Sequence, residues 1–111
     1  MIWEHLISLD QLDEVLNDTS GSVYTIFKHS TRCSISSMAK NRLESKWNPN
    51  LPIDKVYYLD LIKFRDLSAL IAEKLNVEHE SPQVLLVKDG ECFYNASHNS
   101  ISITQLENQL A

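Results

Sequence analysis

A single cysteine between a strand-like run and a helix-like run is the residue best placed for chemistry. Cys33 follows the β-rich residues 22–29, and a helical pattern begins directly after it. The free N–H groups and the dipole of a helix N-terminus stabilise a thiolate, which is the nucleophilic form of cysteine. Cys33 is therefore the candidate nucleophile. The alternative is a small buried apolar residue, a role that free cysteines often fill.

The residues around Cys33 are unusually basic for this chain. Residues 28–47 hold five basic side chains and one acidic side chain, a balance of +4, whereas the rest of the chain carries −9. This excess is either an ordinary solvated helix face or a local positive field around the sulfur. His29 could orient Cys33 or acidify its thiol, although a histidine at a strand end is commonly structural or solvated.

Composition argues against several other classes of function. A chain of 111 residues suits one domain, residues 1–111, and can bury a core without metal or disulfides. The net charge of −5 argues against binding to nucleic acid. The chain has no C-x-x-C or H-x-x-x-H pair, and two glycines are too few for a phosphate-binding loop. We therefore expect no metal, no bound cofactor and no nucleic-acid partner.

Cysteine usage and hydropathy indicate a compartment. Cys33 and Cys92 are too few for a disulfide framework and fit a reducing environment. No basic segment precedes an apolar one at the N-terminus, and no apolar run approaches the about 20 residues of a membrane span. The sequence thus predicts a cytoplasmic protein without membrane contact. Cys92 is expected to be a packed strand residue, with a resolving thiol as the alternative.

Four helices are predicted from capping signals and from apolar residues at helical spacing. Ser8 and Gln11 form a predicted capping box, and the stripe of the helix that follows is Leu9, Leu12, Val15 and Leu16. The second helix is expected at residues 34–47. Its expected inner side is Ile35, Met38, Ala39, Leu43 and Trp47. The third and fourth helices are expected at residues 65–75 and 102–110.

Four strands are predicted, at residues 22–29, 55–61, 83–88 and 91–96. The last two flank Asp89-Gly90, a strong local signal for an antiparallel hairpin with a type I′ turn. The early β–α–β order favours a parallel pair joined by a right-handed crossover. The simplest layered solution is an α/β fold in which helices flank a mixed four-stranded sheet, with an extra helix at the N-terminus.

This order of elements is that of the thioredoxin fold, and the stretch around Cys33 makes the resemblance specific. Residues 27–36, Phe-Lys-His-Ser-Thr-Arg-Cys-Ser-Ile-Ser, closely resemble the active-site stretch of the monothiol bacilliredoxins, a branch of the thioredoxin-like proteins. Residues 66–68, 80–84 and 96–98 resemble later signatures of the same family. The resemblance covers nearly the whole chain.

The resemblance implies an activity. Proteins of that family remove bacillithiol from mixed disulfides on oxidised proteins, with one cysteine as the attacking thiol. By this resemblance Cys33 is the nucleophile, and Ser36 stands where a dithiol relative has its second cysteine. Pro82 stands where thioredoxin-like proteins place a cis-proline. Ser34 departs from the pattern, because the family commonly has proline directly after the cysteine.

The expected site follows from these assignments. Cys33 and Ser36 are the expected catalytic residues, since the serine hydroxyl could hydrogen-bond the thiolate. Expected substrate contacts are Arg32, Ser34, Ser81 and Pro82. A low-molecular-weight thiol, bacillithiol or a similar compound, is the expected co-substrate, and S-thiolated proteins are the expected partners. The alternative is a thioredoxin-like protein-binding module without redox turnover, which Ser34 and the missing second cysteine would explain.

Overall fold

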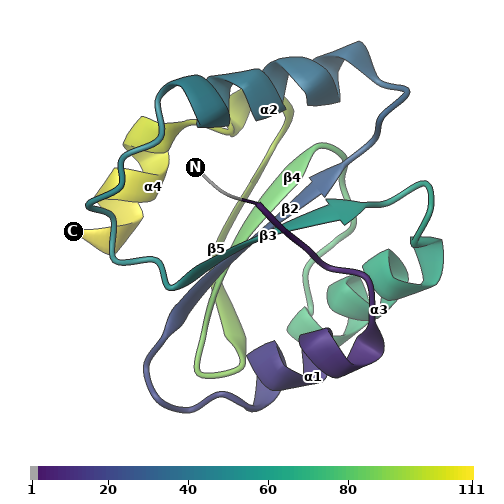
Figure 1. The fold of residues 1–111 in the computed structure, drawn as a ribbon, viewed down its shortest axis with the longest axis vertical. Coiled ribbons are helices and arrows are strands. Elements are labelled where there is room, and N and C mark those ends of the chain that lie inside the picture. The colour runs from purple at the N-terminus through teal and green to yellow at the C-terminus, as the bar shows by residue number, and fades with distance from the viewer. Residues whose placement is uncertain (1–2) are drawn as a thin grey trace.

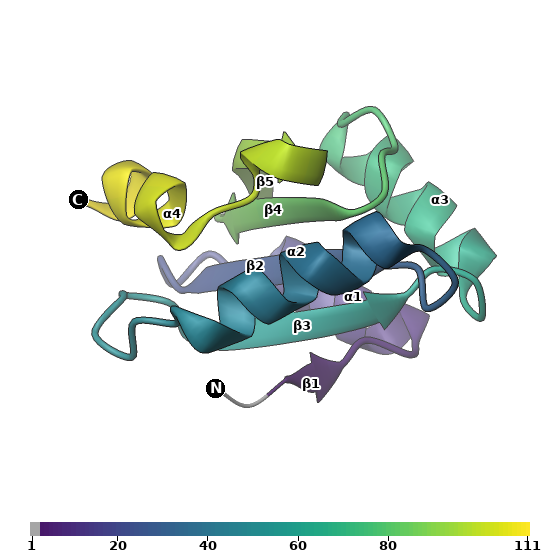
Figure 2. The same ribbon diagram turned by 90° about the horizontal axis from the view of Figure 1, so that it is seen from above.

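A mixed sheet of five strands lies at the centre of residues 3–111, the part of the chain that this computed structural model describes (Figure 1). Its strands are β1 (Glu4–His5), β2 (Val23–His29), β3 (Lys55–Asp60), β4 (Gln83–Lys88) and β5 (Glu91–Ser97). Figure 2 shows their spatial order, β1-β3-β2-β4-β5. The central strand β2 runs parallel to β3 and antiparallel to β4.

The fifth strand corrects the sequence-based expectation of four. In β1, Glu4 and His5 pair in parallel with Tyr57 and Tyr58 of β3. Two residues are too few to show an alternating pattern, so the sequence carried no signal for this edge strand. The predicted α/β class and the mixed sheet are otherwise confirmed.

Within residues 3–111, four α-helices cover the two faces of the sheet (Figure 1). They are α1 (Leu9–Asn17), α2 (Ser34–Ser45), α3 (Arg65–Leu75) and α4 (Ile103–Leu110), and the short turn η1 (His98–Ser100) precedes α4. Helices α1 and α3 pack on one face, whereas α2 and α4 pack on the other. The observed bounds of α3 match the predicted ones, and α2 ends two residues earlier than predicted.

The first helix has the predicted capping box. The Gln11 backbone N–H donates to Ser8 Oγ at 3.3 Å, and the Ser8 N–H donates to Gln11 Oε1 at 3.1 Å. Leu12 and Val15 are buried as predicted. Leu9 is not part of the buried stripe, because it lines a surface pocket and is 47% exposed.

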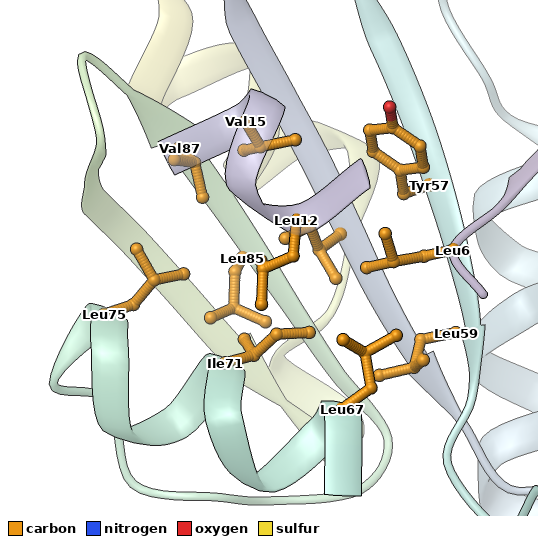
Figure 3. Close-up of a cluster of buried hydrophobic side chains, with 11 residues drawn as sticks. Leu6, Leu12, Val15, Tyr57, Leu59, Leu67, Ile71, Leu75, Leu85 and Val87 are labelled. Carbon is orange, nitrogen blue, oxygen red and sulfur yellow. The ribbon is translucent and has the colours of Figure 1, made fainter. Parts of the chain in front are cut away.

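Both faces of the sheet are packed. Figure 3 shows one core, in which side chains from α1 and α3 meet the strand residues Leu59 and Leu85. The other core lies under α2 and α4. Successive residues of a strand face opposite sides, so Ile26 faces α1 and α3 whereas Phe27 faces α2 and α4.

The predicted hairpin joins β4 to β5. Asp89 and Gly90 have φ angles of 52° and 76°, and a type I′ turn requires positive φ at both central residues. A Cβ at Gly90 would lie 2.5 Å from the carbonyl oxygen of Leu16. The turn therefore packs against the end of α1 so closely that only glycine fits.

The inner face of α2 differs from the prediction. Its buried residues are Ser36, Ala39 and Leu43, whereas Ile35 and Met38 are 47% and 61% exposed. Apolar residues were expected inside because a buried serine without a partner is costly. The Ser36 hydroxyl is hydrogen-bonded to the Ser30 N–H and to His29, so this serine can be buried on the inner face of α2. Beyond the helix, Trp47 packs against the core as predicted.

Candidate active site around Cys33

Cys33 lies at the start of α2, which begins at the end of the sheet where β2 finishes (Figure 1). It is the N-cap residue of α2, and its carbonyl accepts the Ser37 N–H at 3.1 Å. The Cys33 N–H donates to the Ser30 carbonyl at 3.2 Å and closes the turn between β2 and α2. The residue is partly exposed, and its side chain makes no cap hydrogen bond. The thiol is thus left free beside the unpaired N–H groups of the helix.

Ser36 lies fully buried beneath this turn and holds its backbone. The Ser36 Oγ accepts the Ser30 N–H at 3.0 Å and lies 2.6 Å from Nδ1 of His29. Among the hydrogen bonds of residues 3–111, none joins Ser36 to Cys33, so the expected bond to the thiolate is not seen. The structure gives Ser36 a positioning role in the turn that carries the sulfur.

His29 is the second member of this buried pair. Burial lowers the pKa of His29, and the positive charge of Lys40 lowers it further, so the ring is neutral at pH 7. Nδ1 of the neutral ring accepts the Ser36 hydroxyl hydrogen in one tautomer and donates its own hydrogen to Ser36 Oγ in the other, so the hydrogen bond forms in both. The ring also stacks on Phe27 with 5.8 Å between centroids. Because Ser36 occupies Nδ1, this nitrogen takes no proton from Cys33, and the geometry supports the structural interpretation of His29.

Replacing Ser36 with alanine should lower the free energy of unfolding by about 1–3 kcal/mol, because the Ser30 N–H and His29 Nδ1 lose a shared buried partner. Urea-induced unfolding measures this change. The matched control is Ser34→Ala at the exposed first residue of α2, which should change stability by less than about 0.5 kcal/mol. Equal stability of the two variants would contradict the role assigned to Ser36.

The peptide bond between Ser81 and Pro82 is cis and lies at the same end of the sheet. In the ladder between β2 and β4, Lys28 pairs with Gln83. Residues just before Gln83 therefore lie beside the end of β2 that leads to Cys33. The Ser81 Oγ is buried and has no hydrogen-bond partner within residues 3–111.

The residues predicted to contact substrate thus share one end of the sheet. Arg32 and Ser34, on either side of Cys33, are both exposed. The loop after β3 also reaches this end, since the Leu61 N–H donates to the His29 carbonyl at 3.1 Å. This loop was not among the predicted site residues. The parallel pairing of β2 and β3 was the available signal, because parallel strands bring their carboxyl ends to one edge.

Most of the basic excess in residues 28–47 is engaged in the structure. Lys40 pairs with Glu44 at 3.0 Å, and the Arg42 guanidinium donates to the carbonyls of His98 and Ile101. Lys28 is fully buried. Arg32 is the exposed cation next to Cys33 in the chain.

Cys92 lies toward the other end of the sheet. It pairs with Val87 in β5, and its Sγ donates to the Tyr94 carbonyl at 3.2 Å. Burial raises the pKa of the Cys92 thiol. Val87 is four residues along β4 from Gln83, roughly 13 Å at strand spacing, whereas bridged cysteines have Cα atoms within about 7 Å. Cys92 is a packed strand residue as predicted, and this geometry excludes an internal disulfide with Cys33.

Metal-binding clusters and membrane-spanning helices are absent from residues 3–111. No group of three or more His, Cys, Asp or Glu side chains in residues 3–111 is placed to hold a metal ion. None of the helices in the same part of the chain has the length and apolar character needed to cross a membrane. The nucleophile that the geometry presents is the partly exposed thiol of Cys33 at the start of α2.

Comparisons with known proteins bear on the family and the fold of this chain. The model of a family described as monothiol bacilliredoxin BrxC matches residues 4–106. A solved protein with a thioredoxin fold, titled as a candidate oxidoreductase, has a TM-score of 0.76 and 33% identity over 94% of this chain and 89% of its own.

Two thioredoxins are more distant. A point mutant from Halobacterium salinarum NRC-1 matches with a TM-score of 0.70 at 15% identity, over 96% of this chain and 85% of its own. Thioredoxin from Trypanosoma brucei brucei matches with a TM-score of 0.72 at 12% identity, over 97% and 89%. At these identities the two matches show the fold alone.

Proposed function

Because this chain belongs to the monothiol bacilliredoxin family, we propose that it removes a low-molecular-weight thiol, bacillithiol or a similar compound, from mixed disulfides on proteins. One observation carries the proposal. A partly exposed thiol stands at the start of α2, and the position three residues later holds a buried serine instead of a second cysteine. The reaction is a thiol–disulfide exchange that uses one sulfur of the enzyme.

The first step transfers the small thiol to Cys33. The Cys33 thiolate attacks the sulfur of the small thiol within the mixed disulfide, and a new S–S bond forms as the old one breaks. The client protein leaves as a thiolate and takes a proton from water. The number of disulfide bonds is unchanged, because one is exchanged for another.

The second step needs a thiol from outside the chain. Ser36 cannot form a disulfide, and the geometry excludes a bridge from Cys92. In this proposal a second molecule of small thiol attacks the adduct, regenerates Cys33 and leaves as a symmetrical disulfide. The alternative is a thiol of another protein, which would leave as a mixed disulfide with the small thiol. A reducing cytoplasm, which the cysteine usage favours, is the proposed compartment.

The remaining site residues hold the substrate in this proposal. The backbone of Ser81, next to the cis peptide bond, pairs with an extended segment of the client protein as an added strand. Arg32 and Ser34 flank the sulfur and are exposed, so they contact the small thiol. Arg32 supplies the positive charge that an anionic thiol prefers.

Adduct formation tests the proposal. Purified protein is mixed with a substrate protein that carries one mixed disulfide with bacillithiol, acid-quenched, digested and mapped by mass spectrometry. We expect the mass of the small thiol on the peptide containing Cys33 and not on the peptide containing Cys92. A parallel reaction with a glutathione mixed disulfide compares the two small thiols. An unmodified Cys33 after prolonged incubation with both substrates would instead favour the binding module without turnover.

A further inference from the structure

Lys28 is fully buried in β2 and forms no ion pair with a carboxylate among residues 3–111. It lies between Phe27 and His29 in the strand, so it faces α3 on the opposite side of the sheet. Its Nζ donates to the Ser68 carbonyl at 3.2 Å and lies 3.2 Å from Nδ1 of His79. Burial lowers the pKa of Lys28 to about 8, so it remains mostly charged at neutral pH.

This lysine determines which nitrogen of the His79 ring carries the hydrogen and keeps the ring neutral. An ammonium group can only donate hydrogen bonds, so Nδ1 of His79 accepts and carries no hydrogen. The ring is then neutral, with its hydrogen on Nε2 at the far edge from Lys28. Burial lowers the pKa of His79, and the charge of Lys28 lowers it further, whereas Glu80 opposes both effects. His79 thus presents an N–H donor on the side away from the buried cation.

His79 and Ser68 line a surface cavity of about 400 Å³ beside α3, together with Leu61, Arg65, Ala69 and Ala72. The lining holds one permanent cation, Arg65, and no carboxylate. Glu80 is not a lining residue, and its carboxylate lies 3.8 Å from Nε2 of His98. The rest of the wall is mainly apolar. The uncompensated charge of Lys28 lies directly behind two of the lining residues.

We propose that this cavity binds a small organic carboxylate, with the anion on Arg65 and the Nε2–H of His79 and the carbon chain against the apolar wall. A guanidinium matches a carboxylate with two parallel hydrogen bonds. The positive charge behind the wall favours an anion over a neutral analogue. The apolar wall disfavours phosphate, which carries polar oxygens on every side. The site lies on the α3 face of the sheet and does not depend on the chemistry of Cys33.

Titration of isotope-labelled protein with butyrate, followed by two-dimensional amide NMR, tests the proposal. Amides of the lining residues should shift and saturate, with a dissociation constant on the order of millimolar. Butyramide has the same shape without the charge and should shift the same amides far less. Arg65→Gln should weaken butyrate binding about tenfold, because the bidentate contact is lost. Lys63→Gln is the matched control, since Lys63 has the same charge but does not line this cavity.

A second variant tests whether the buried charge of Lys28 strengthens butyrate binding. Lys28→Met removes the charge with a side chain of similar length and should weaken butyrate binding severalfold without touching the ligand. If this variant fails to fold, the butyramide comparison and the Arg65→Gln variant still test whether the cavity binds a carboxylate. Equal shifts with butyrate and butyramide, or unchanged affinity in Arg65→Gln, would overturn the proposal. Stronger binding of inorganic phosphate at the same amides would overturn the assignment to an organic carboxylate.

Discussion

A Cys33→Ser variant should lose at least about a thousandfold in the rate of small-thiol transfer from a thiolated protein, because a serine hydroxyl cannot attack a disulfide at neutral pH. The proposed cycle contains one sulfur nucleophile, and the structure places it at the start of α2 with no side-chain cap bond. Cys92→Ser is the matched control. It should keep most of the activity, because Cys92 lies toward the far end of the sheet.

The measurement is the loss of small-thiol mass from the substrate protein over time, in the presence of excess free small thiol. Circular dichroism checks that both variants are folded. Full activity in the Cys33 variant would exclude the mechanism. A wild-type protein that binds the thiolated substrate as tightly as the Cys33 variant does, and releases nothing, would instead be a binding module.

Phe27→Ala should cost about 3–5 kcal/mol of unfolding free energy, the largest stability loss that we expect from one side chain near the site. Phe27 is fully buried in the central strand, and its ring stacks on Trp3 and His29 at centroid distances of 5.5 and 5.8 Å. Alanine would leave a cavity under α2. It would also remove the surface against which the imidazole that holds Ser36 is packed.

Urea-induced unfolding followed by far-ultraviolet circular dichroism measures this loss. Phe93→Ala is the control with the same chemical change, and it should cost at most about 1 kcal/mol because the Phe93 side chain is 42% exposed. Similar losses in the two variants would mean that the packing around Phe27 is not as tight as described.

Local signals explain what the sequence predicted correctly. The capping box at Ser8 and Gln11 and the Asp89-Gly90 turn each depend on residues close together in the chain, and both are present. Helix α3 has an apolar stripe that its own periodicity reveals. The location of Cys33 between a strand and a helix also followed from local pattern.

Contacts between distant residues explain what the sequence did not predict. The inward turn of Ser36 depends on His29 and on the backbone of Ser30, which no periodicity encodes. Lys28 was counted among residues of a basic stretch, yet it is buried against His79, 51 residues away in the chain. Sequence patterns predict that a polar residue is exposed, because its buried hydrogen-bond partners are not visible in the local sequence.

The buried hydrogen bonds of Ser36 hold the reactive turn without taking part in the reaction of the sulfur. A dithiol protein that closes a bridge at this position changes its covalent connectivity with every cycle, and its resistance to denaturation changes with it. Here the support beneath the reactive turn consists of a hydroxyl, an imidazole and a backbone amide, none of which alters its oxidation state. Loading and unloading the sulfur therefore leaves these contacts as they were.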